Sequence, residues 1–437
     1  MMEISFLEAL IEKCSERGCS NVETSLQKGF SVRVGLEKDN IITYFIEHNF
    51  IHLRTMLDGK LGCVTISASK NLSLDAIADI TVSSAIANPY RYRKAQYFFT
   101  NRTLPFDVDK EKKIMYSDFD NNDLLINTWI AWIKTEAKKI SQNFKCQLLS
   151  LLFTHEFEEF VFLNSNGTKG RYSLNNSHVG GAVQLNLSTR QQLVSFSSNG
   201  LKYGDKIFEI LDRQNFSDRL RYHSATQFEE LKGRVKFSKI ASAQLISSIA
   251  QAFNGELAVI NNSFLKKEDI GKKIWDENIN IIDDPIAKEG KLFIPFDNEG
   301  MPASRKFLVS QGIPREFLCD ILTQMKLGDG RPGNGYRKPP DYLIGIYPSN
   351  LILEVNGDIE EDYDLYVGEL GYQTVFNASS GLLNGVVFGY KINSSGKVPV
   401  MFHLGIHINQ IFSKILPASL PEWIGTNFVP EFIAIIR

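Results

Sequence analysis

In the first 95 residues, the hydrophobic positions have helical spacing in some segments and form short runs typical of β-strands in others. Apolar residues recur at helical spacing between Ser5, which with Glu8 is predicted to form a capping box, and Gly18, which is predicted to end the helix. Four short runs rich in β-branched and aromatic residues follow, SVRVGLE, IITYFIE, IHLRTML and GCVTISA, and they predict strands. A second helix is predicted from Ser73 to a stop before Pro89.

The pattern changes again after a polar, lysine-rich link. Apolar residues between Leu125 and Ile140 fall on one stripe and predict a third helix, after which the chain is β-rich. Another helix is predicted over 241–253, followed by short strands and Gly/Pro/Asn/Asp turns. The fold class is therefore predicted to be α+β. The predicted domains are an N-terminal α+β domain (1–110), a central helix with a β-rich segment (111–230) and a C-terminal β-rich domain (231–437).

Charge and cysteine content narrow the possible functions. The 48 basic and 50 acidic residues leave a net charge of −2, which gives no basic footprint for nucleic acid. The acidic N-terminus does not resemble a signal peptide, and no apolar run approaches the roughly 20 residues that span a membrane. The five cysteines are scattered and odd in number. We therefore expect a cytoplasmic protein with reduced thiols and without nucleic-acid or membrane partners.

The stretch THEFEEF offers the first candidate metal site. Zinc peptidases commonly carry two histidines four residues apart on a helix, with a glutamate beside the first. Here the residue four positions after His155 is Glu159, and the surroundings are typical of a strand that leads to an Asn166–Gly167 turn. We therefore interpret this stretch as an exposed, charged edge of a β-hairpin.

Two further pairs of potential metal ligands carry weaker signals. Cys14 and Cys19 could contribute to a zinc cluster, but the more common reading is two partly buried thiols. His403 and His407 would share one face of a helix. The segment around them resembles a strand, with a helix starting later, so the alternative is a histidine pair in the core or at an interface.

Three carboxylates form the remaining candidate. Asp283 and Asp284 precede a proline, which is typical turn chemistry, although a carboxylate pair can also perform acid–base catalysis. Together with Glu299 they could also hold a divalent cation. An enzyme that uses these three carboxylates without a metal ion is therefore one functional hypothesis, in addition to the two given below.

An ordered series of motifs resembles a known family. The segments GKKIWDENINIIDDP and FIPFDNEGMPASRKFLVSQGI are followed by the loop GRPGNGYR, by YPSNLILEVNGD and by NASSGLLNGVVFGYKINSSGKVPV. In this order they resemble the TldD/PmbA (TldE) family, long labelled modulators of DNA gyrase, and the resemblance extends to the N-terminus. The residues that match the family pattern are Ile281, Asp283, Asp284, Pro285, Phe296, Asp297, Glu299, Gly300, Pro302, Gly312, Gly333, Asn334 and Arg337.

The resemblance implies a peptidase system with two kinds of chain. TldD-type chains carry His-Glu-x-x-x-His on a helix and a distant cysteine, and these bind zinc, whereas PmbA/TldE-type chains lack them. The corresponding helix here is QLISSIAQAFNG, which places Ile246 and Gln251 at the histidine positions and Ser247 at the glutamate. No cysteine follows Cys319. The resemblance thus predicts no catalytic residue and no metal or other cofactor in this chain, and zinc in a partner subunit.

Two functional hypotheses follow from the resemblance. The first is a non-catalytic TldE/PmbA-like subunit that forms a heterodimer with a TldD-like zinc peptidase subunit and helps degrade or trim unfolded peptides, including leader or precursor processing of a ribosomal peptide. The second is a stand-alone binding or regulatory protein that forms a homodimer. The candidate peptide-binding residues are Arg331, Asn334, Tyr336 and Arg337. A purely structural turn is the alternative for this loop.

Overall fold

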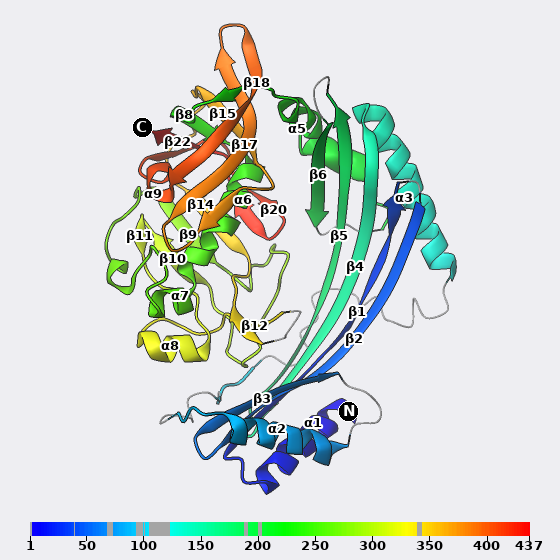
Figure 1. Ribbon diagram of the computed structural model, residues 1–437, viewed down its shortest axis with the longest axis vertical. Helices are drawn as coiled ribbons and strands as arrows, with labels where there is room; N and C mark the ends of the chain where they lie inside the picture. Colours follow the sequence, from blue (N-terminus) through cyan, green and yellow to red (C-terminus); the bar gives the residue numbers. More distant parts are fainter. Residues whose placement is uncertain are drawn as a thin grey trace.

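The computed structural model describes residues 2–38, 40–67, 73–92, 99, 101–104, 123–187, 191–199, 203–338 and 343–437. Figure 1 shows a long, curved sheet beside a C-terminal part that contains several smaller sheets. Helices and strands are both abundant, so the predicted α+β class is confirmed. No helix within the described ranges combines the length and apolar content needed to cross a bilayer.

The curved sheet has six antiparallel strands in the order β3-β2-β1-β4-β5-β6. The strands are β1 (Asn21–Glu37), β2 (Asn40–Leu57), β3 (Lys60–Ser67), β4 (Gln147–Asn164), β5 (Lys169–Asn186) and β6 (Gln191–Asn199). The predicted runs IITYFIE and IHLRTML are both part of the single strand β2. Because β1 pairs directly with β4, the predicted segments 1–110 and 111–230 share one sheet.

Three helices cover one face of this sheet: α1 (Met2–Glu16), α2 (Leu74–Ala87) and α3 (Asp123–Phe144). Alternate residues of β1 point to this face; Val22 and Leu26 pack under α1 and α2, and Phe30 and Val32 pack under α3. The Ser73 hydroxyl caps α2 by accepting a hydrogen bond from the Ala76 backbone N–H at 3.1 Å, as predicted.

The predicted start of the first helix is wrong. Helix α1 begins at Met2, so Ser5 lies inside the helix rather than at its N-cap. A Ser-x-x-Glu pattern also occurs within helices, and here Ile4, which precedes Ser5, already packs against the cluster that α1 shares with α2. The end was predicted correctly, because Gly18 follows the helix with a φ of 87° that favours glycine.

The C-terminal part contains an eight-stranded and a six-stranded sheet. Their strands are β7 (Phe228–Glu229), β8 (Gly233–Phe237), β9 (Ile279–Asp283), β10 (Lys306–Ser310), β11 (Ile313–Pro314), β14 (Leu351–Val355), β15 (Leu365–Leu370), β16 (Val375–Asn377), β17 (Leu382–Asn393), β18 (Gly396–His407), β19 (Ile415–Pro417), β20 (Glu422–Ile424), β21 (Asn427–Val429) and β22 (Phe432–Ile436). A separate pair is formed by β12 (Gly335–Arg337) and β13 (Ile344–Ile346).

The remaining helices are short. They are α4 (Ile207–Arg213), α5 (Phe216–His223), α6 (Lys239–Ile249), α7 (Gly255–Val259), α8 (Ile321–Leu327), α9 (Ile408–Ile411) and the 3₁₀ turns η3 (Ala250–Phe253) and η4 (Lys267–Asp269). Two of them, α4 and α5, bury apolar residues in the same core cluster as α3 and the curved sheet. Helix α6 and the 3₁₀ turn after it fit the helix predicted over 241–253. Apolar residues of α6 share one core cluster with residues of both C-terminal sheets, so α6 is a central packed element.

A smaller aromatic cluster joins the curved sheet to the C-terminal part. Phe160, Phe162 and Tyr172 on the face opposite the helices pack against Phe296 and Tyr336. The ring centroids of Tyr172 and Phe296 lie 4.9 Å apart in an edge-to-face arrangement. This contact brings the GRPGNGYR loop against the sheet.

Candidate functional site

Helix α6 occupies the position at which the family resemblance places a zinc site. The Ser238 hydroxyl caps the helix by accepting from the Ala241 backbone N–H at 3.0 Å. Leu245, Ile246 and Ile249 are each 1% exposed and belong to the main core cluster. The helix is therefore held by apolar packing along the side that carries Ile246.

The three positions aligned with the zinc motif do not fit a metal. The Ile246 side chain is buried hydrocarbon, which has no lone pair to donate. The Ser247 hydroxyl accepts a hydrogen bond from the Asn427 side-chain amide at 2.9 Å. Gln251 is exposed on the η3 turn. Zinc is bound in proteins by thiolate, imidazole and carboxylate groups, and these positions supply none of them.

The four candidate peptide-binding residues have different surroundings. Arg331 is about half exposed, pairs with Glu316 at 2.5 Å and donates to the Arg305 carbonyl at 3.0 Å. Tyr336 is buried in the aromatic cluster, and its hydroxyl donates to the Gly333 carbonyl at 3.3 Å. Among the four, only Arg331 presents its side chain to solvent, because Asn334 and Arg337 are also buried.

Asn334 is the centre of a buried polar network. Its side-chain oxygen accepts from Lys306, and its amide nitrogen donates to Asp283 at 2.8 Å and to the Tyr347 carbonyl at 3.2 Å. Asp283 also accepts from the Ser349 backbone and hydroxyl at 2.6 and 2.7 Å. Burial raises the pKa of Asp283 and lowers the pKa of Lys306. The network joins the loop to β9 and β10 within the interior.

Arg337 belongs to a second buried cluster, which contains two arginines and two glutamates. Its backbone N–H donates to the Asn298 side chain at 2.6 Å, and burial lowers the pKa of its guanidinium. Arg54 donates to Glu23 at 2.7 Å and also pairs with Glu299. Burial raises the pKa of Glu23 to about 7 even though Arg54 lies beside it. This cluster connects β1 and β2 to the C-terminal part.

The three candidate carboxylates serve different local contacts. Asp283 belongs to the Asn334 network, and the Asp284 side chain accepts from the Ile286 backbone at 3.2 Å. Glu299 pairs with Arg54 and accepts from the Ile321 backbone at 2.7 Å. Within the described residues, no three His, Cys, Asp or Glu side chains are arranged to hold a metal ion. Each of the three carboxylates therefore contacts its own local partners, and the three are not arranged around one common site.

The sequence interpretation did not single out Glu23, Arg54 or Lys306, although they lie in these two clusters. Arg54 interrupts the otherwise uncharged predicted strand IHLRTML, and Glu23 interrupts the uncharged stretch NVETSL, which precedes the predicted strands. That isolated charge is the signal that could have identified them. Glu23 and Arg54 lie directly opposite each other because β1 and β2 pair in one register along their whole length. The sequence does not show this register.

The stretch THEFEEF lies in β4 and forms a hairpin with β5, as predicted. The predicted exposed edge is wrong, because β4 pairs with β1 on its other side and lies inside the sheet. His155 is 3% exposed beneath α3, and one ring nitrogen lies 2.7 Å from the Ser177 hydroxyl. Burial lowers the pKa of His155 to about 4. Glu159 pairs with Arg171 and, at 2.8 Å, with Lys28.

The other two metal-ligand pairs are also placed by the fold. His403 lies on strand β18 and is exposed, with its ring stacked 4.0 Å from that of Phe228, and His407 caps α9. Residues four apart on a strand are separated by roughly 13 Å, too far to share one metal ion. Cys14 and Cys19 are buried free thiols, and burial raises the pKa of Cys14 to about 12.

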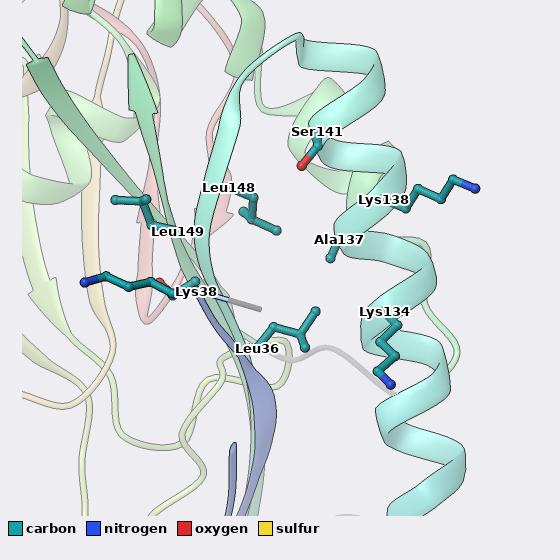
Figure 2. A pocket seen from close by; sticks show the side chains of 9 residues that line it. Leu36, Lys38, Lys134, Ala137, Lys138, Ser141, Leu148 and Leu149 are labelled. Carbon is teal, nitrogen blue, oxygen red and sulfur yellow. The ribbon is translucent and has the colours of Figure 1, made fainter. Parts of the chain in front are cut away.

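A hollow of about 260 Å³ lies between α3 and the ends of β1 and β4. Figure 2 shows Leu36, Leu148 and Ala137 facing it, whereas the Lys138 side chain points away from the sheet. Three lysines and two serines also line the hollow, but no carboxylate, imidazole or thiol does, so its lining lacks the usual acid–base and metal-binding groups of a catalytic site.

Comparisons with known proteins point to one family. Residues 231–430 match the model described as the PmbA/TldA metallopeptidase C-terminal domain. An uncharacterized protein of Methanocaldococcus jannaschii is 23% identical over 457 aligned residues, which cover 98% of each chain. A metalloprotease of Archaeoglobus fulgidus is 40% identical over 98 residues, 22% of each chain. The crystal structure of TldE from Thermococcus kodakarensis has a similar fold, with a TM-score of 0.77 at 16% identity over 98% of each chain.

Proposed function

This chain belongs to the TldD/PmbA family, and we propose that it is a non-catalytic, TldE/PmbA-like subunit that acts with a zinc-bearing TldD-type subunit. The pair would degrade or trim unfolded peptides, with leader or precursor processing of a ribosomal peptide as one use. The cytoplasmic location expected from the reduced cysteines is part of this proposal.

The observation that carries the proposal is the state of helix α6. Ile246 stands where a zinc ligand is expected and is packed into the core with Leu245 and Ile249. The sequence contains no histidine or cysteine between His223 and Cys319, so a shift of register along the helix restores no such ligand. Without a bound metal ion at this helix, a water molecule there is not activated for attack on a peptide bond.

Peptide contact is the positive role that we assign to this chain. Arg331 is the candidate residue that can reach a bound peptide without any rearrangement, because its guanidinium is already at the surface beside Glu316. A guanidinium can bind a peptide carboxylate with two parallel hydrogen bonds. Asn334, Tyr336 and Arg337 would then act indirectly, by fixing the loop that carries Arg331.

Co-expression with a TldD-type chain from the same genome tests this proposal. The purified pair should contain one zinc ion per heterodimer and should cleave a labelled unstructured peptide, with activity lost on chelation. Each chain alone should be inactive, and this chain alone should contain substoichiometric zinc. The proposal fails if this chain alone holds one tightly bound zinc ion, if it cleaves the peptide alone, or if the two chains do not associate.

A further inference from the structure

A lysine, an asparagine and an aspartate meet in the interior of the C-terminal part. Lys306 on β10 lies directly opposite Asp283 on β9, so their side chains leave the same face of the sheet. Asn334 contacts both of them. Its backbone N–H donates to the Cys319 carbonyl at 3.0 Å, and its carbonyl accepts from the Tyr347 N–H at 3.1 Å, which fixes its position. The three side chains are at most 1% exposed, so water is kept away from them.

The partners of the Asn334 side chain fix which way its amide points. The oxygen accepts from the Lys306 Nζ, and the nitrogen donates to Asp283 Oδ2 at 2.8 Å and to the Tyr347 carbonyl at 3.2 Å. In the reversed orientation, the amide nitrogen would face the ammonium and the oxygen would face two acceptors. The lysine nitrogen therefore lies on the carbonyl side of the amide, and the aspartate lies beside the amide nitrogen.

The surroundings favour a neutral lysine and a protonated aspartate. An ammonium has three N–H donors, and among the described residues only the Asn334 oxygen accepts from Lys306. Burial lowers the pKa of Lys306 and raises the pKa of Asp283, so a proton passes more readily from the ammonium to the carboxylate. This transfer leaves an amine that is a nucleophile and a carboxylic acid that can donate a proton.

We propose that Lys306 and Asn334 react with each other to form an intramolecular isopeptide bond, with Asp283 as the proton carrier. The Nζ of Lys306 attacks Cγ of Asn334, and the bond from Cγ to Nδ2 breaks. Asp283 donates its proton to the departing nitrogen and takes one from Nζ, so the products are one new amide and one ammonia. The reaction needs no oxidant and no cofactor, and groups held in contact react far faster than free ones. The proposal is independent of the peptidase role, because all three groups belong to this chain.

A second route to ammonia loss starts from the same asparagine. Asn334 precedes Gly335, and attack of the Gly335 backbone nitrogen on the Asn334 side chain would give a succinimide with the same change in mass. In the structure the Gly335 N–H donates to Asp297 Oδ2 at 2.9 Å, which holds this nitrogen in a buried hydrogen bond. The experiments below distinguish the two products, because only the isopeptide bond needs the lysine.

The first experiment measures the intact mass of the purified full chain by mass spectrometry. The wild type should be lighter than the mass calculated from its sequence by one ammonia, about 17 Da. After denaturation and trypsin digestion, the segments 306–315 and 327–337 should appear as one branched peptide joined between Lys306 and Asn334. Separate linear peptides at full yield would contradict the proposal.

Variants assign the roles of the three groups. Lys306→Met removes the nucleophile, Lys306→Arg replaces it with a guanidinium that stays protonated, and Asp283→Asn removes the proton carrier. Each variant that is folded by circular dichroism should have the full mass calculated from its own sequence. Lys326→Met, at an exposed lysine of α8, is the control and should lose ammonia as the wild type does.

The decisive measurement is made on the wild type, so it does not depend on whether a variant folds. The proposal is overturned if the wild type keeps its full calculated mass after prolonged incubation at neutral pH. It is also overturned if the Lys306 variants lose ammonia to the same extent, because the product would then be the succinimide.

Discussion

Arg54 on β2 forms an ion pair with Glu299, which lies between β9 and β10, and this pair crosses from the curved sheet to the C-terminal part. Both side chains are at most 5% exposed. Glu23 lies opposite Arg54 on β1 and accepts a second hydrogen bond from the same guanidinium at 2.7 Å. One arginine therefore connects two carboxylates that come from different parts of the fold.

Removing this arginine should destabilise the protein strongly. In Arg54→Ala, two buried glutamates lose their cationic partner, and breaking a buried pair in this way typically costs about 3–5 kcal/mol. Urea denaturation followed by circular dichroism measures the change. Lys232→Ala provides the control, because Lys232 pairs with Glu230 at an exposed position, where ion pairs contribute about 0–1 kcal/mol. Equal effects of the two substitutions would contradict the assigned role of Arg54.

The Asn334 network gives a second prediction. Asn334→Ala removes one partner from Asp283 and one from Lys306, both of which stay buried, and should cost about 2–3 kcal/mol of unfolding free energy. Asn262→Ala, at an exposed asparagine, should change the unfolding free energy by less than about 0.5 kcal/mol. A cost within the range of this control would mean that the network does not stabilise the loop.

Local signals in the sequence predicted the elements that depend on neighbouring residues. Ser73 and the Asn88–Pro89 step set the ends of α2, and the turn at Asn166–Gly167 sets the β4–β5 hairpin. The fold class followed from the same kind of pattern. These predictions succeeded because capping and turn geometry depend on a few consecutive residues.

Predictions that depended on distant residues were less successful. The position of His155 inside the sheet requires the β1–β4 pairing, which joins segments more than 100 residues apart. The burial of Asn334 depends on Asp283 and Lys306, which approach it only after the C-terminal sheets have formed. A polar loop rich in glycine and arginine looks like a surface feature until these partners are known.

Acid should weaken the fold through His155. Its pKa falls from an ordinary 6.5 to about 4 on burial, so below pH 6.5 the unfolded chain binds a proton that the folded chain does not. The unfolding free energy should therefore decrease as the pH falls from 6.5 to 4, by about 2–3 kcal/mol from this group. Urea titrations at several pH values should show a smaller decrease for His155→Asn. His403→Asn, at an exposed histidine, should leave the decrease unchanged, and equal slopes for both variants would contradict the assignment.

Helix α6 should not regain a metal site through its most direct substitution. Ile246→His puts a polar ring into the main core and should cost about 2–4 kcal/mol of unfolding free energy. Metal analysis should show no added zinc. Ile260→His, at an isoleucine that is 61% exposed, is the matched control and should have little effect on stability. Stoichiometric zinc in Ile246→His would show that the helix still has the geometry of a metal site.

Arg331 provides the test of peptide contact within the assembled pair. Arg331→Ala should raise the KM for an unstructured peptide about 3- to 10-fold and leave kcat nearly unchanged, because the residue lies on the surface and would contribute to binding alone. Its unfolding free energy should change by no more than about 1 kcal/mol, since the pair with Glu316 is partly exposed. Arg315→Ala removes another exposed arginine nearby in the sequence and should leave the KM unchanged. If both variants have the wild-type KM, Arg331 does not bind the peptide. An equal rise in both would indicate a general effect of positive charge.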